Sequence, residues 1–77
     1  MGMQTYIDRD RDSGIRAYQL GPGWIHVQFK DGSVYEWTDR SCGHSNIAMM
    51  HRLAVAGDGL NRFINLHVKK TYSRKVR

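Results

Sequence analysis

The chain has 77 residues, a formal net charge of +5 at neutral pH and one cysteine. A chain this short forms one domain, and a single cysteine excludes an intrachain disulfide. No apolar run approaches the roughly 20 residues needed to span a bilayer, and the polar start lacks the apolar stretch of a signal peptide. We therefore expect a soluble, cytoplasmic protein that does not bind a membrane.

The positive charge is unevenly placed along the chain. Residues 1–68 contain seven basic and seven acidic side chains, so their charges cancel. All of the net charge lies in residues 69–77, with the sequence KKTYSRKVR. Such asymmetry predicts an anionic partner, most often nucleic acid, and the alternative is a solvated tail.

The first twelve residues are predicted to form a polar leader. Asp8, Asp10 and Asp12 occupy the first ligand positions of a calcium-binding loop. However, Ser13 stands where that loop requires glycine, and Gln19 stands at the position of its bidentate glutamate. The pattern therefore predicts no calcium site.

Three strands are predicted in the first half of the domain. Residues 14–20 are rich in strand formers, residues 24–29 alternate between apolar and polar side chains, and so do residues 33–37. The segments GPG and KDG between them are turn signals. This order predicts a three-stranded antiparallel β-meander.

Two short helices are predicted in the second half. The first shows helical spacing of apolar side chains, with Ser45 or Asn46 as N-cap and Gly57 as left-handed C-cap. The second follows Asp58, a candidate N-cap. Their predicted core residues are Ile47, Met50, Leu53 and Ala54 in the first helix, and Leu60, Phe63, Ile64 and Val68 in the second. The predicted fold class is α+β, a small sheet covered on one face by these helices.

The length of the hairpin loop before Val34 decides which side chains face the helices. A two-residue loop would place Glu36 among aliphatic side chains, which would cost several kcal/mol if its carboxylate were charged and unpaired. A three-residue loop over residues 30–32, with Gly32 in the left-handed region, places Tyr35 and Trp37 on the apolar face instead. We therefore predict the three-residue loop.

The order of these motifs resembles the KTSC domain family over residues 13–73. That family is marked by Tyr-x-Tyr after a strand and a glycine-bearing turn, where this chain has Tyr35 and Trp37. Its second half has a glycine, a helix with an aromatic and an asparagine, and a basic stretch with a tyrosine, which match Gly59, Asn61, Phe63, Lys69, Lys70 and Tyr72.

Two features depart from the family pattern. Trp37 replaces the second tyrosine, and residues 38–47 lack the Val-Pro that often follows. The family is named for a segment at the C-terminus of some lysyl-tRNA synthetases. The resemblance therefore implies RNA binding, and it implies no established activity.

A nucleic-acid site is predicted in the basic C-terminal arm, residues 69–77, which follows the domain at residues 13–68. Basic side chains neutralise phosphates, and an interleaved aromatic ring can stack on a base. The predicted contacts to RNA or DNA are Lys69, Lys70, Tyr72, Arg74, Lys75 and Arg77. Arg40, Arg52 and Arg62 would extend this patch if the helices present them on the same side.

The alternative function is that of a bacterial or phage protein–protein interaction or inhibitor module, which binds another protein or a second copy through the sheet face that the helices leave open. That face is predicted to carry Trp24, His26, Gln28, Val34 and Glu36. His26 and Glu36 face each other there, which is more often a cross-strand contact than an acid–base pair. No spacing marks a second catalytic group, so we predict a non-enzymatic binding module.

Cys42 and His44 supply at most two ligands, whereas a structural zinc site requires four. His51 and His67 would join them only by accident of folding, and Cys42 has no marked partner as a nucleophile. The sequence therefore predicts neither a metal nor a cofactor.

Overall fold

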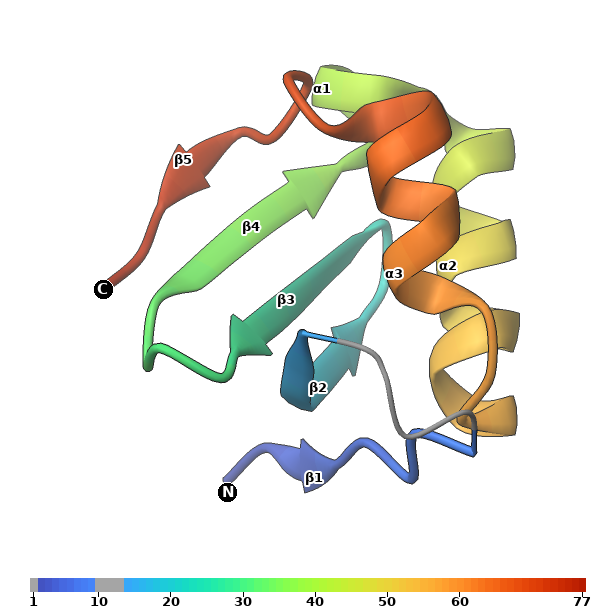
Figure 1. The fold of residues 1–77 in the computed structure, drawn as a ribbon. Helices are drawn as coiled ribbons and strands as arrows, with labels where there is room; N and C mark the ends of the chain where they lie inside the picture. Colours follow the sequence, from blue (N-terminus) through green and yellow to red (C-terminus); the bar gives the residue numbers. More distant parts are fainter. Residues whose placement is uncertain (1, 10–13) are drawn as a thin grey trace.

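The chain folds into an antiparallel sheet with helices on one face, the predicted α+β class (Figure 1). The computed structural model describes residues 2–9 and 14–77. In these residues five strands lie in sequence order across the sheet. They are β1 (Gln4–Thr5), β2 (Ile15–Gly21), β3 (Trp24–Phe29), β4 (Val34–Thr38) and β5 (Arg74–Lys75). The helices are α1 (Asp39–Cys42), α2 (His44–Ala56), α3 (Leu60–Phe63) and the π-helix η1 (Ile64–Val68).

The predicted number of three strands is wrong, because the outermost strands come from the segments predicted as leader and arm. β1 pairs with β2, and β5 pairs with β4. Each has only two residues, too few to show an alternating pattern in the sequence. β2, β3 and β4 follow one another as the predicted meander, whereas β4 reaches β5 through the helical half. Residues 10–13, which contain the predicted boundary at residues 12–13 and two of the compared aspartates, lie outside the described residues.

The hairpin between β3 and β4 has the predicted three-residue loop. The backbone N of Phe29 donates to the carbonyl O of Ser33 at 2.8 Å, and Gly32 N donates to Phe29 O at 2.9 Å. Gly32 has φ 93°, in the left-handed region that favours glycine. Trp37 is consequently paired with Ile25 and shares its face of the sheet.

A bulge in β2 reverses the alternation at the start of that strand. Ile15 pairs with Phe29, whereas Ala17 pairs with Gln28, which leaves Arg16 as the extra residue. Ile15 therefore lies on the helix-covered face together with Tyr18, and both are buried.

Helix α2 begins earlier than predicted. Its N-cap is Gly43 rather than Ser45 or Asn46, because α1 directly precedes it. Thr38 and Ser41 form a capping box that starts α1. The C-terminal prediction is confirmed: Gly57 has φ 72° and its N–H bonds to carbonyls of the last turn.

The second predicted helix is α3 continuing into η1. Its N-cap is Gly59 rather than Asp58. Leu60, Ile64 and Val68 are buried as predicted, and Phe63 packs against the core. The core lies between the sheet and these helices and consists of Tyr6, Ile15, Tyr18, Ile25, Val27, Trp37, Ile47, Met50, Ala54, Leu60, Ile64 and Val68. None of the described helices has the length and apolar character needed to cross a membrane.

Candidate nucleic-acid interface

The basic C-terminal segment is held against the sheet at the carbonyl of Val68. This oxygen accepts hydrogen bonds from Trp37 Nε1 at 2.8 Å and from Thr71 N and Thr71 Oγ1 at 3.0 Å each. Together they end η1 and turn the chain back toward β4. Ser73 N then donates to Glu36 O at 2.6 Å. The side chains of residues 69–77 are exposed, but the backbone of this segment is part of the fold.

Because Arg74 and Lys75 belong to strand β5, the residues predicted to contact phosphate lie on both faces of the sheet. Lys75 pairs with Tyr35 and Arg74 with Glu36, and neighbouring residues of a strand point to opposite faces. Lys75 Nζ lies 5.9 Å from the centroid of the Tyr35 ring, on the helix side. Arg74 Nε instead donates to Glu36 Oε1 at 3.2 Å on the other side. Arg77 lies at the sheet edge, where its N and O bond to the backbone of Val34.

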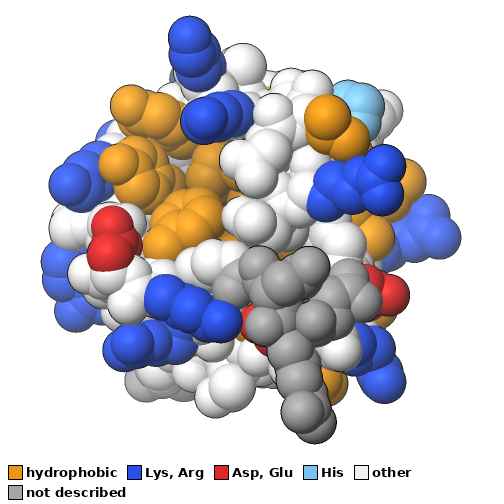
Figure 2. Space-filling view, viewed as in Figure 1, with side chains coloured by type: hydrophobic (Ala, Val, Ile, Leu, Met, Phe, Trp, Pro, Cys, Tyr) orange, Lys and Arg blue, Asp and Glu red, His pale blue; other side chains and the backbone are white. Residues whose placement is uncertain are grey.

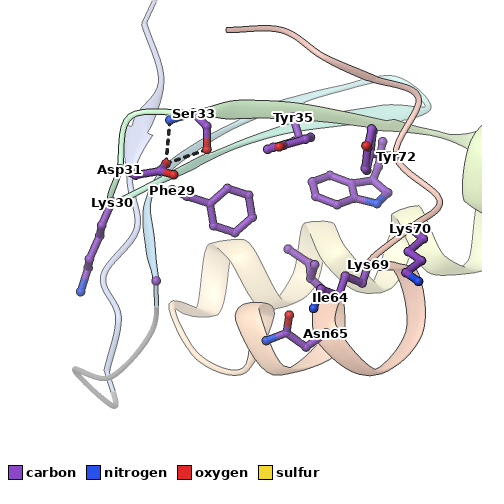
Figure 3. Close-up of a pocket in the computed structure, with 12 residues that line it drawn as sticks. Phe29, Lys30, Asp31, Ser33, Tyr35, Ile64, Asn65, Lys69, Lys70 and Tyr72 are labelled. Carbon is purple, nitrogen blue, oxygen red and sulfur yellow. Dashed lines mark hydrogen bonds between the residues drawn. The ribbon is translucent and has the colours of Figure 1, made fainter.

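Four aromatic rings gather where β3, β4 and the C-terminal segment meet (Figure 3). The rings are those of Phe29, Tyr35, Trp37 and Tyr72. Tyr35 lies edge-on to Phe29 and to Tyr72, with centroids 5.9 and 4.8 Å apart, and Trp37 and Tyr72 are 6.3 Å apart. Such edge-to-face contacts stabilise an aromatic cluster beyond the area that it buries.

These rings line a cavity of about 610 Å³, which we call the aromatic cavity. The sheet and the helical segment η1 form its opposite walls (Figure 3). Its lining residues are Gly14, Phe29, Lys30, Asp31, Ser33, Tyr35, Trp37, Ile64, Asn65, Lys69, Lys70 and Tyr72.

Tyr35 and Trp37 both point to the helix side, as the loop length predicted, but their environments differ. Trp37 is 2% exposed and belongs to the core. Tyr35 is half-buried and lines the cavity. Tyr72 is 43% exposed, so its ring is accessible to a ligand. The helices cover the end of β4 that carries Trp37 and leave space beside Tyr35.

Lysines stand at both ends of the aromatic cavity. Lys30 lies at the hairpin end, and Lys69 and Lys70 lie at the end of η1 (Figure 3). Figure 2 shows the same arrangement at the surface, with hydrophobic side chains gathered over β3 and β4 and basic side chains around them. The two ends of the cavity therefore carry lysines, and its interior is lined by aromatic rings.

Asp31 is the acidic residue lining the cavity. Its Oδ1 accepts hydrogen bonds from Ser33 Oγ at 2.6 Å and Ser33 N at 2.9 Å. These bonds lower the pKa of the Asp31 carboxyl, which is ionised at neutral pH. Three lysines against one carboxylate leave the lining positive.

The opposite face of the sheet carries a small ionic cluster. His26 Nε2 lies 2.9 Å from Glu36 Oε2, the cross-strand contact predicted from the loop length. Hydrogen bonding from His26, and secondarily from Arg74, lowers the pKa of Glu36. Both side chains of the pair are less than one fifth exposed. The cluster links β5 to the hairpin, and the lowered pKa keeps Glu36 ionised at neutral pH.

The predicted protein-binding face is smaller than the sequence suggested. Val34 is 2% exposed, because the C-terminal segment bonds to its backbone through Val76 N at 2.7 Å. Its expected exposure is therefore wrong. Trp24 and Gln28 are half-buried. The Trp24 indole packs over Gly21, where a Cβ atom would clash with it, and lies 4.6 Å from the His26 ring.

The remaining chemical candidates lie apart from the aromatic cavity. Burial raises the pKa of the Cys42 thiol, which keeps it protonated at neutral pH. His44 Nδ1 lies 3.4 Å from Asp39 Oδ1, and His51 Nε2 lies 2.9 Å from Trp24 O. Among the described residues, no three His, Cys, Asp or Glu side chains are grouped so as to hold a metal ion.

Sequence reasoning missed part of the cavity lining. Phe29, Lys30, Tyr35 and Asn65 line it together with the predicted Lys69, Lys70 and Tyr72. The loop length places Phe29 and Tyr35 on the helix side, so their shared face was available from the sequence. The space between the sheet and η1 could not be predicted from the sequence, because it depends on where η1 crosses the sheet.

The three arginines that were expected to extend the basic patch are separated by the fold. Arg52 and Arg62 line neither the aromatic cavity nor a second depression beside it, whereas Arg40 lines the second depression.

No protein-family model, no curated protein and no solved structure matches this chain.

Proposed function

We propose that this protein is a non-enzymatic module that binds single-stranded nucleic acid in the aromatic cavity. The observation that carries the proposal is the combination of accessible aromatic rings with lysines at both ends of one cavity. Proteins that bind single strands combine these two features: rings that stack on bases and cations that follow the backbone. The resemblance to the KTSC family favours RNA over DNA.

Stacking is the first contribution. Tyr72 is 43% exposed and Tyr35 is half-buried beside it, so each can present ring surface to a base. A base stacked on an aromatic side chain contributes about 1–3 kcal/mol, largely independent of which base it is. The cavity volume of about 610 Å³ accommodates at least one base with its sugar. Asn65 adds an amide that can bond to a base edge.

Phosphate attraction is the second contribution. Lys69 and Lys70 are exposed and have no ion-pair partner among residues 2–9 and 14–77, whereas Lys30 lies 3.4 Å from Asp8 Oδ2. A strand that crosses the cavity from Lys30 to Lys70 would meet cations at entry and exit. Each phosphate contact on a single strand releases about 0.7 counterions, which makes the affinity depend on salt.

A protein-binding role is the second candidate, favoured by the half-buried Trp24 ring against His26 on the opposite face. Tryptophan is enriched among the residues that dominate protein interfaces. The two candidates use opposite faces of the sheet, so substitutions on one face separate them.

The direct test is fluorescence anisotropy with labelled ten-nucleotide single strands of RNA and DNA over a KCl series. Tyr72→Ala should weaken binding about tenfold, since it removes one stacking ring, and Tyr72→Phe should retain most of the affinity. Lys69→Gln should lower the slope of log K against log [KCl] by about 0.7. Arg62→Gln removes the same charge from a helix surface outside the cavity and is the matched control.

Absence of binding to either strand at low salt would contradict the proposal. Equal weakening by Lys69→Gln and Arg62→Gln would also contradict it, because that result would show general attraction to a basic protein. Trp24→Ala should leave affinity for the strands unchanged. Point substitutions serve better than removal of the C-terminal segment, because this segment contains β5.

A further inference from the structure

A second depression of about 510 Å³ adjoins the aromatic cavity, and we call it the hydroxyl depression. Its lining consists of Thr38, Arg40, Ser41, Lys70, Thr71, Tyr72 and Ser73. Lys70 and Tyr72 line both spaces, so the Tyr72 ring stands between them.

Two separate pieces of chain form the hydroxyl depression. Thr38 Oγ1 accepts from Ser41 N at 3.1 Å and Ser41 Oγ accepts from Thr38 N at 3.0 Å, which fixes the short helix that carries Arg40. The turn after η1 is fixed by the bonds from Thr71 to Val68 O. Figure 1 shows this turn beside α1. Arg40 and Lys70 are thereby brought to one depression, although 30 positions separate them.

The chemistry of the two spaces differs. The aromatic cavity has four rings, whereas the hydroxyl depression has two cations, four serine or threonine side chains and the ring of Tyr72. Arg40 and Lys70 are exposed, and neither side chain forms an ion pair or a hydrogen bond with the described parts of the chain. The nearest carboxylate in sequence, Asp39, has His44 3.4 Å from its Oδ1. A guanidinium without a carboxylate partner is suited to bind a phosphate with two parallel hydrogen bonds.

We propose that Arg40 and Lys70 hold the backbone phosphate next to a base that occupies the aromatic cavity. The ligand is then a single strand of at least two nucleotides, with one base on the Tyr35 side of Tyr72 and the adjoining phosphate on the Arg40 side. Bases in a duplex are stacked and paired and cannot enter the cavity without being extruded. This proposal rests on the proposed function and adds to it the position of the strand and the contact at Arg40.

The test measures the salt dependence of binding to the same ten-nucleotide strands. Arg40→Gln should lower the slope of log K against log [KCl] by about 0.7, as expected for one lost phosphate contact on a single strand. Arg40→Lys keeps the positive charge, so it should retain the slope. Arg52→Gln, which removes a charge from the exposed surface of α2, should leave the slope unchanged.

A second measurement locates the contact. Backbone amide shifts of the ¹⁵N-labelled full chain are followed on addition of adenosine, the dinucleotide ApA or inorganic phosphate. ApA should shift amides at Arg40 and Ser73 as well as those lining the aromatic cavity, and adenosine should shift only the latter. Inorganic phosphate should bind at least tenfold more weakly than ApA, because it lacks the stacked base.

The outcomes separate this inference from the proposed function. If the strands bind and Tyr72→Ala weakens this binding, but Arg40→Gln keeps the full slope of log K against log [KCl], the Arg40 contact is wrong. The aromatic site is retained in that case. The Arg40 contact would also be wrong if Arg40→Gln and Arg52→Gln lowered the slope equally. It would likewise be wrong if inorganic phosphate bound as tightly as ApA. If no strand binds the unaltered protein, the proposed function itself fails.

Discussion

At the scale of single residues, Trp37 does most to connect the core to the candidate site. Its indole is buried, and its Nε1 donates to Val68 O at the point where the chain leaves η1. The ring also forms part of the cavity wall beside Tyr72. One side chain thus contributes burial, a hydrogen bond and the position of the segment that carries the lysines.

We predict that Trp37→Phe destabilises the protein by about 2 kcal/mol, from the loss of a buried hydrogen bond and of part of the ring. Val68 O keeps its bonds from Thr71, so no acceptor is left wholly unpaired. The measurement is urea unfolding followed by circular dichroism. Trp24→Phe, at a half-buried ring on the other face, should cost less, and an equal cost would contradict the role given to the Trp37 bond.

At the scale of elements, β5 is a strand held more by its neighbours than by its own length. It has two residues, and the ion pair of Arg74 with Glu36 joins it to the contact of Glu36 with His26. The pKa of Glu36 is lowered in the folded protein by these partners. Its ionised form therefore stabilises the fold above the ordinary pKa of a glutamate, and this stabilisation is lost as the pH falls through the lowered value.

We predict that Glu36→Gln lowers the free energy of unfolding by about 0.5–1 kcal/mol at pH 7, the range of a partly exposed ion pair. The difference from the unaltered chain should shrink as the pH falls below the ordinary carboxylate range, because Glu36 then becomes protonated in both states. Urea midpoints at several pH values between 7 and 3 check this. Asp58→Asn removes an exposed negative charge elsewhere, and an equal pH effect there would contradict the assignment to Glu36.

At the scale of the whole molecule, the two ends of the chain complete the fold. Tyr6 is buried in the core and its hydroxyl accepts from Leu60 N at 3.2 Å, while residues 73–77 bond to β4. A 77-residue domain buries only about 60% of its unfolded surface, so losing either edge removes a large part of its stability. Residues 69–77 therefore supply the whole net charge of the protein and also part of its stability.

We predict that a chain ending at Val68 loses its cooperative unfolding transition or unfolds at a much lower urea concentration. It would lack β5, the bonds from Thr71 to Val68 O and the cover over Val34. Circular dichroism over a urea series is the measurement. The full-length variant Lys69→Gln should unfold close to the unaltered protein, since its side chain is exposed. An unchanged midpoint for the shortened chain would show that β5 is dispensable.

The sequence was informative where the chain's own periodicity decides the structure. The length of the hairpin loop predicted that Tyr35 and Trp37 lie on the helix side and that His26 lies opposite Glu36. Helical spacing identified Ile47, Met50 and Ala54 as core. These follow from local rules, because strand alternation and helical repeat are fixed by neighbouring residues. For the candidate site, the concentration of basic residues around a tyrosine in residues 69–77, rather than any periodicity, identified Lys69, Lys70 and Tyr72.

The α+β class, the hairpin register, the core-facing sides of the helices and the clustering of charge thus follow from local patterns in the chain. Three features emerge only on folding: β1 and β5 extend the sheet, Arg74 and Lys75 separate onto opposite faces, and Arg40 lies beside Lys70. They emerge only then because pairing of a two-residue strand and the space left beside a crossing helix depend on contacts between distant segments. No local pattern encodes such contacts, and the aromatic cavity is one of their products.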